Sequence, residues 1–319
     1  MQSAQDRRRA WSVPMVLLLL SACSRTSSAP DPTAPNTPAP PASQTATPMI
    51  HDGTPRIVDS AAGKVHIEYH VYGRGQPLIV LVHGWSCDSN YWAAQLKPLA
   101  AKYTIVTVDL AGHGASGVNR KDWSMAAFGS DVAAAVQAMP DAGKVILVGH
   151  SMGGPVAIEA ARQLGARVLG VIGVDTFRSV GLPPPPLAER KQRLAEFEKD
   201  FIGSARAFVT SSMFRKDADP AFVRRVAAGM SQARPEVAIG ALRTYYDWPA
   251  VAAMHSLSVP IVAINSDLHG VTDEAQIRKI VPQFRVVTIA DTGHFLMMER
   301  PEKFNPELLK QIASLVSAP

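Results

Sequence analysis

The stretch Lys144–Gly154 reads KVILVGHSMGG, and it constrains the interpretation of the whole chain. Its apolar, β-branched first half predicts a buried strand, and the Ala, Ile and Glu residues that follow it predict a helix. Between them, Gly149 and Gly153 flank Ser151 in the pattern G-x-S-x-G, which is typical of a nucleophile elbow. Glycine suits both positions because so tight a turn leaves no room for side chains. Such a turn raises the serine hydroxyl at the positive end of the next helix, where negative charge is favoured.

Strand and helix patterns alternate beyond residue 54, which predicts a mostly parallel sheet covered by helices on both faces. After a hairpin of Arg56–Asp59 with Val65–Val71, the predicted strands are Leu78–Val82, Thr104–Val108, Val145–Val148, Val168–Val174, Ile261–Ile264 and Arg285–Ile289. The predicted helices are Trp92–Ala101, Ala126–Met139, Gly154–Leu164, Asp273–Ile280 and Pro306–Val316. Residues 176–254 break the alternation with amphipathic helical segments, so we expect a helical cap over the carboxyl edge of the sheet.

Four further stretches fall just after predicted strands, namely Val82–Trp85, Asp109–Ser116, Asn265–Asp267 and Asp291–Phe295. Together with the elbow, they resemble the α/β-hydrolase family, and the resemblance covers residues 54–319. It implies an α/β-hydrolase core of residues 54–175 and 255–319, with the cap of residues 176–254 inserted between two sheet strands.

A serine hydroxyl is a poor nucleophile at neutral pH and needs a base, which in turn needs an acid to orient it. In this family the chain order is serine, acid, histidine. His294, in a Gly-His-Phe turn after the last strand, is the expected base. The resemblance places the acid at Asp267, although Asn265-Ser266 replaces the usual preceding glycine. Asp175, at the end of the preceding strand, is a position that a minority of these enzymes use, and it stays open as the alternative.

The resemblance also implies an oxyanion hole made by the backbone N–H groups of Trp85 and Met152. It favours a carboxylesterase-like serine hydrolase acting on a small-molecule ester with a small or medium apolar acyl group. Other members of the fold are lactonases, carbon–carbon bond hydrolases, aminopeptidases, and cofactor-free haloperoxidases or perhydrolases, and a tethered binding protein without turnover also stays open. No metal-ligand spacing is present in the sequence, and we expect no cofactor.

The first 48 residues carry the features of an export signal and a tether, and we do not expect them to belong to the folded domain. Residues 1–22 combine three arginines with a short apolar run, as a signal peptide does. The run ends in Leu20–Cys23, which looks like the lipobox of bacterial lipoproteins and implies a lipid on the Cys23 thiol. Residues 23–48, rich in Pro, Ser, Thr and Ala, predict an extended tether. Ser24 in place of aspartate implies an outer-membrane anchor facing the periplasm.

Charge and cysteine content argue against nucleic-acid binding and against a disulfide-stabilised fold. Removing residues 1–22, with three arginines and one aspartate, lowers the formal charge from +5 to +3, and no basic block with interleaved aromatics suggests nucleic-acid binding. The two cysteines are Cys23 and Cys87, so acylation of the first leaves no intramolecular disulfide. The sequence gives no oligomeric state.

Overall fold

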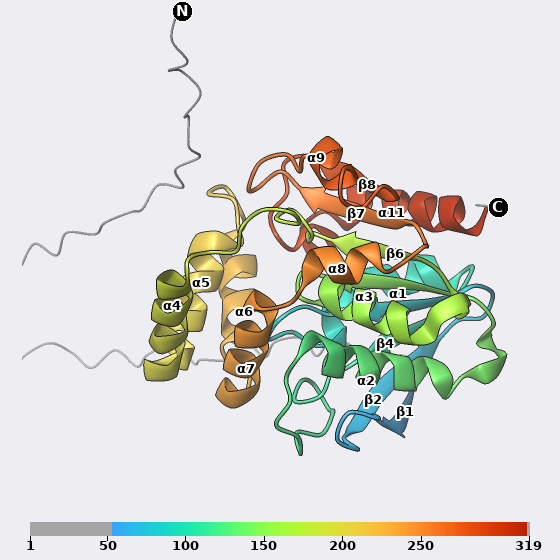
Figure 1. Ribbon diagram of the computed structural model, residues 1–319, viewed down its shortest axis with the longest axis horizontal. Coiled ribbons are helices and arrows are strands. Elements are labelled where there is room, and N and C mark those ends of the chain that lie inside the picture. Colours follow the sequence, from blue (N-terminus) through green and yellow to red (C-terminus); the bar gives the residue numbers. More distant parts are fainter. Residues whose placement is uncertain (1–52, 318–319) are drawn as a thin grey trace, which may run out of the picture. The chain divides into compact units, whose positions relative to one another are not determined.

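A single eight-stranded sheet forms the centre of the computed structural model, which describes residues 53–317 (Figure 1). The predicted signal peptide, Cys23 and tether lie outside these described residues. The spatial order of the strands is β1-β2-β4-β3-β5-β6-β7-β8. Their bounds are β1 Thr54–Asp59, β2 His66–Tyr72, β3 Leu78–Val82, β4 Thr104–Val108, β5 Val145–His150, β6 Val168–Val174, β7 Ile261–Ser266 and β8 Phe284–Ile289.

The strand directions confirm the expected hydrolase architecture. β1 and β2 form the predicted antiparallel hairpin, and β2 also pairs antiparallel with β4. All other neighbours, from β4 through β3, β5, β6 and β7 to β8, are parallel. Every residue of β3 and β5 is buried, as their unbroken apolar sequences predict for strands covered on both faces. Parallel strands bring their carboxyl ends to one edge, where the loops after β3, β5, β6, β7 and β8 can meet.

Helices cover both faces of the sheet. On one face α1 contacts β4 and α11 contacts β6, while on the other α2 and α3 pack together over β1, β2, β5 and β6 (Figure 1). The helices outside the inserted segment are α1 Ala93–Ala100, α2 Met125–Gln137, α3 Gly153–Leu164, α9 Glu274–Arg278, α10 Leu296–Glu299 and α11 Pro301–Val316. Short 3₁₀ turns lie at Ser89–Trp92, Pro140–Ala142 and Gly165–Arg167.

The segment between β6 and β7 is helical, as expected for a cap. It contains α4 Leu187–Lys199, α5 Phe201–Ser212, α6 Pro220–Met230, α7 Pro235–Tyr246 and α8 Ala250–His255. Figure 1 shows α4 to α7 grouped beside one end of the sheet, while α8 returns to pack on α3. The chain therefore leaves the sheet after β6 and re-enters it at β7.

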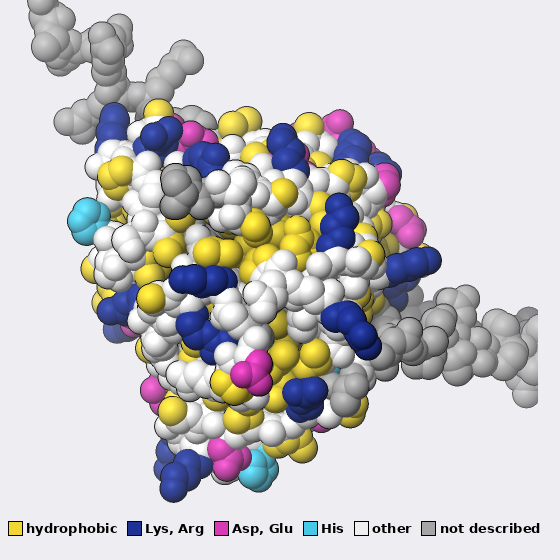
Figure 2. Space-filling model, turned by 90° about the vertical axis from the view of Figure 1, so that its right-hand side faces the viewer, with side chains coloured by type: hydrophobic (Ala, Val, Ile, Leu, Met, Phe, Trp, Pro, Cys, Tyr) yellow, Lys and Arg dark blue, Asp and Glu magenta, His cyan; other side chains and the backbone are white. Residues whose placement is uncertain are grey.

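In the view of Figure 2, Lys and Arg side chains are dispersed among uncharged and apolar ones. Among residues 53–317, no helix is both long enough and apolar enough to cross a membrane.

Candidate active site

Ser151 lies in a strained turn between β5 and α3. Its φ is +51°, a left-handed conformation that costs a non-glycine residue energy and is found mostly at functional sites. The serine N–H donates to the carbonyl of Val174 at 2.9 Å, so the turn is fixed to the end of β6. A Cβ on Gly149 would come within 2.1 Å of the Gly153 carbonyl oxygen, which explains the glycine at that position. The elbow predicted from the sequence is thus present as a strand–turn–helix unit.

The loop after β3 lies against this elbow. A Cβ on Gly84 would lie 3.2 Å from Ser151 Cβ and 2.9 Å from His150 Nδ1, so the backbone passes directly beside the serine. Trp85 follows in this loop, and Met152 follows the serine at the amino end of α3. N–H groups in the first turn of a helix have no partner within the helix, so they are free to bind an anion. The role of Trp85 and Met152 as oxyanion donors stays a prediction.

His294 is brought to the elbow by the loop after β8. Its ring lies beside that of His150, with centroids 4.8 Å apart, and its carbonyl accepts a hydrogen bond from His150 Nε2 at 2.9 Å. Its Nδ1 lies 2.6 Å from Asp175 Oδ2. That side of the imidazole is therefore occupied by a carboxylate, and Nε2 remains as the nitrogen able to take a proton from a hydroxyl.

The expected pairing of Asp267 with His294 is wrong in this structure. Asp267 Oδ1 instead lies 3.3 Å from Arg215 Nη1 of the cap and 3.4 Å from the N–H of Thr292. Asp175 takes its place because a positive φ of 48° after β6 turns the carboxylate towards the histidine. The Asp175 side chain is 1% exposed, against 27% for Asp267.

Two residues that the sequence reasoning missed hold Asp175 in position. The Asn265 side chain, fully buried in β7, accepts from the N–H of Thr176 at 3.0 Å and donates to its carbonyl at 3.1 Å. Arg178 donates to Asp175 Oδ1 at 2.6 Å. The signals available in the sequence were an asparagine inside an apolar strand and an arginine three residues after a strand-end aspartate.

Burial acts to raise the pKa of the Asp175 carboxyl, but the hydrogen bond and charge of His294, together with Arg178, outweigh it. Its pKa is therefore held well below the ordinary value, and the carboxylate is charged at neutral pH. Burial, reinforced by the neighbouring His294, lowers the pKa of His150 to about 3, so this ring is neutral. Glu299 accepts from the N–H groups of Gly293 and Phe295, which fixes the loop that carries His294.

The cap contacts the site at two places. The Trp85 indole donates to the Ala238 carbonyl of α7 at 2.8 Å, and its ring packs edge-on against Phe197, Phe201 and Phe208 of α4 and α5. The carbonyl of Met213, after α5, accepts the N–H of His294 at 2.9 Å. The cap thus touches both the loop beside Ser151 and the loop of the histidine.

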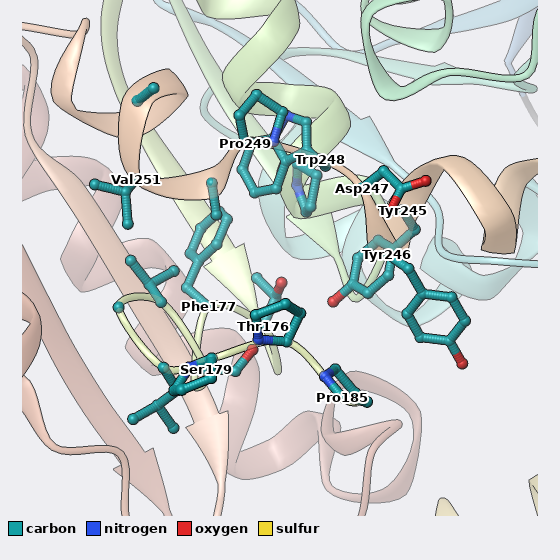
Figure 3. Close-up of a pocket in the computed structure, with 18 of the residues that line it drawn as sticks. Thr176, Phe177, Ser179, Pro185, Tyr245, Tyr246, Asp247, Trp248, Pro249 and Val251 are labelled. Atoms are coloured by element: carbon teal, nitrogen blue, oxygen red, sulfur yellow. The ribbon is translucent and has the colours of Figure 1, made fainter. Parts of the chain in front are cut away.

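A separate cavity of about 700 Å³ lies between the two connections that join the cap to the core. Figure 3 shows its aromatic and proline side chains; residues of the outgoing connection (Thr176, Phe177, Ser179, Pro185) and the returning one (Tyr245, Tyr246, Trp248, Pro249, Val251) line it. Ser151 and His294 are not among its lining residues. Across residues 53–317, no cluster of His, Cys, Asp and Glu side chains is arranged to hold a metal ion.

Comparisons with known proteins identify the family and the fold. A sequence model described as "Alpha/beta hydrolase family" matches residues 79–307. A thermophilic esterase from Thermogutta terrifontis superposes with a TM-score of 0.72 at 23% identity, covering 82% of this chain and 99% of that one. The enol-lactonase from Burkholderia xenovorans LB400 gives a TM-score of 0.70 at 16% identity, covering 81% and 100%. At these identities, the two structures establish a common fold only.

A curated relative is the dihydrolipoyllysine-residue acetyltransferase component of the acetoin cleaving system of Pseudomonas putida. It is 26% identical over 255 residues, which cover 76% of this chain and 65% of the relative. The chain therefore spans less than two thirds of that protein, and between 27% and 46% of seven further curated relatives.

Proposed function

This chain belongs to the alpha/beta hydrolase family, and from that premise we propose that it is a serine hydrolase that cleaves carboxylic esters of small to medium apolar acyl groups. The observation that carries the proposal is the buried pair of His294 Nδ1 and Asp175 Oδ2, 2.6 Å apart, beside the strained turn of Ser151. Asp175 replaces Asp267 as the acid. The Thermogutta terrifontis esterase shares this fold, so the fold is one that can carry ester hydrolysis.

In the proposed reaction, His294 Nε2 takes the Ser151 proton while the serine oxygen attacks the ester carbonyl. The backbone N–H groups of Trp85 and Met152 bind the oxyanion that forms. His294 then returns the proton to the departing alcohol, leaving an acyl-enzyme that water hydrolyses by the same steps. Asp175 fixes the imidazole tautomer and stabilises the imidazolium.

The preference for apolar acyl groups rests on the aromatic cluster at the cap. Trp85 follows directly on the loop residue beside Ser151, and Phe197, Phe201 and Phe208 surround its ring within 5.4–6.2 Å between centroids. Such rings favour contact with hydrocarbon over contact with charged groups.

The test compares hydrolysis of p-nitrophenyl acetate, butyrate and octanoate by the wild type, Ser151→Ala and Ser130→Ala. Ser130 lies on α2 and bonds to Gln163, so it serves as the matched control. We expect Ser151→Ala to lose on the order of 10⁴-fold or more in kcat, and Ser130→Ala to match the wild type. Undiminished turnover by Ser151→Ala refutes the nucleophile. A folded wild type that turns over none of the three esters refutes the proposed substrate class and favours a binding protein.

We also propose that residues 1–22 are removed and that a lipid on Cys23 anchors the domain in the cell envelope. Support comes only from the sequence, because these residues lie outside the described part of the chain. Cys23→Ala should shift the protein from the membrane fraction to the soluble fraction. Acyl chains still present on that variant would refute the anchor.

A further inference from the structure

Arg178 fills the space behind the Asp175 carboxylate and leaves that group a single orientation. Oδ1 of the aspartate accepts from Arg178 Nη2 at 2.6 Å and from the Ser266 N–H at 2.8 Å. Oδ2 is then the oxygen that faces His294 Nδ1. Rotation of the carboxylate would break three hydrogen bonds at once in a buried site, so the arginine fixes the acid towards the histidine.

The guanidinium is itself held by the loop after β7. Nη1 donates to the carbonyl of Gly270 at 2.7 Å and Nη2 to the carbonyl of Ser266 at 2.7 Å, with longer contacts to the Ser266 and Thr272 hydroxyls. The side chain is only 19% exposed. A planar guanidinium with fixed donors suits this set of acceptors, which a single ammonium cannot satisfy together.

This loop also contains Asp267, the position at which the family resemblance predicts the acid. Here the loop contributes backbone carbonyls that bind an arginine, and the arginine holds an acid from the neighbouring strand. We propose that Arg178 is a positioning residue for the reaction: it orients Asp175 towards His294 and partly offsets the negative charge that the histidine experiences. This inference rests on the proposed function.

The charged and titratable groups around His294 come from several elements. Asp175 and Arg178 follow β6, the neutral His150 ends β5, and Glu299 lies on α10 beneath the histidine loop. His269, after β7, also interacts electrostatically with Asp175 and His294. Arg178 is the cation in direct contact with the acid, so its removal strengthens the attraction of Asp175 for a proton on the imidazole.

The test uses Arg178→Met and Arg178→Lys in the full-length protein. Arg178→Met removes the charge and the donors, so kcat/KM should fall about 10- to 100-fold with KM changed less than kcat. The acidic limb of kcat/KM should move to higher pH by roughly half to one unit. Arg178→Lys keeps the positive charge but loses the paired N–H donors of the guanidinium. The acidic limb of its kcat/KM profile should therefore stay near that of the wild type, while kcat falls.

Arg162→Met is the matched control, because Arg162 Nη1 pairs with Glu159 Oε2 at 2.7 Å, three residues away on α3. It should leave rate and pH profile unchanged. An acidic limb in Arg178→Met that coincides with the wild type overturns the proposal, whatever the loss of rate, since a purely structural role would lower the rate alone.

A measurement without turnover separates this inference from the proposed function. The ring proton signals of His294, assigned with His294→Gln, can be titrated by NMR in the wild type and in Arg178→Met. We expect the midpoint in the variant to lie at higher pH, even if no ester is hydrolysed. Identical midpoints in the two proteins overturn the role of Arg178. If the midpoints differ but the wild type hydrolyses no ester, only the proposed esterase function is refuted.

Discussion

The Asp175 carboxylate lies against His294, while the carboxylate of Asp267 lies between Arg215 and the Thr292 N–H. Both aspartates follow parallel strands, and both satisfy the chain order serine, acid, histidine. What separates them is the backbone: Asp175 has a φ of +48° and turns its side chain towards the histidine. The backbone conformation at the end of β6 therefore distinguishes the acid, and contacts with β7 and the loop after it hold that conformation.

At this scale, Asp175→Asn should lower kcat by on the order of 10⁴-fold, because an amide cannot hold the imidazole in the required tautomer. Asp267→Asn should stay within a few-fold of the wild type, since that partly exposed carboxylate contributes a weak ion pair with Arg215. Steady-state kinetics on p-nitrophenyl butyrate, with circular dichroism as a check on folding, measures both. The reverse order of effects would restore Asp267 as the acid.

This difference marks how far the sequence could predict the site. Ser151 and His294 lie in short motifs with local signals, a flanking glycine pattern and a Gly-His-Phe turn. The choice between the aspartates, and the role of Arg178, depend on contacts between residues about 90 positions apart, such as Arg178 with Gly270. No local pattern encodes those contacts.

At the scale of elements, the ends of β6 and β7 form one unit. Asp175 and Phe177 both have positive φ values, and Asn265 of β7 binds the N–H and carbonyl of the intervening Thr176. A third bond joins Asn265 to the Thr272 hydroxyl at 2.8 Å. The strained connection to the cap is thus held by a buried side chain of the next strand.

Asn265→Leu keeps the volume but leaves the N–H and carbonyl of Thr176 buried without partners. Each such group costs about 1–3 kcal/mol, so the free energy of unfolding should fall by at least roughly 2 kcal/mol. Urea unfolding measures this loss, and kcat should fall with it because Asp175 is adjacent. Asn119→Leu, at an exposed loop position, is the control. Equal stability of the two variants would contradict the role of Asn265.

The apolar runs of the sequence predicted the strand positions closely, whereas the predicted ends of some helices differ from those in the structure. The last helix was expected from Pro306, but α11 begins at Pro301. Proline is favoured in the first turn of a helix, where its missing N–H has no partner to lose. Two prolines five residues apart both fit that rule, and Pro306 is accommodated inside the helix instead.

At the scale of the molecule, the cap and core share contacts at the site rather than merely lying side by side. The Trp85 indole of the core donates to a carbonyl of α7, and the carbonyl of Met213, after α5, accepts from the His294 N–H. Beneath them, the rings of His83, His113 and His150 are buried in the core. Burial lowers the pKa of each, to about 3 for His113 and His150.

These buried histidines predict a stability that depends on pH. The folded-state pKa values of His113 and His150 lie below the ordinary 6.5, so the unfolded chain binds more protons than the folded protein between pH 6.5 and 3. The contribution of these histidines to the free energy of unfolding is present in full above about pH 6.5 and is lost progressively as the pH falls through that window. Between pH 7 and 5, His113 and His150 should each lower the free energy of unfolding by about 2 kcal/mol. Asp175, with its lowered pKa, loses its own contribution only at more acidic pH.

Urea unfolding of the wild type and of His113→Asn at pH 7 and pH 5 measures this effect. The drop between the two pH values should be about 2 kcal/mol smaller in the variant, because one titrating group is gone. His255→Asn, which replaces an exposed histidine, is the matched control. A drop in His113→Asn equal to that of the wild type would contradict the neutral, buried state of His113.

The most direct test of the central claim, that Ser151 is an activated nucleophile, is covalent trapping with a fluorophosphonate followed by peptide mass spectrometry. It needs no knowledge of the natural ester. We expect one adduct per chain, on the peptide that contains Ser151, absent in Ser151→Ala and much slower to form in Asp175→Asn. A folded protein that acquires no adduct, or acquires it equally in Ser151→Ala, would contradict the account.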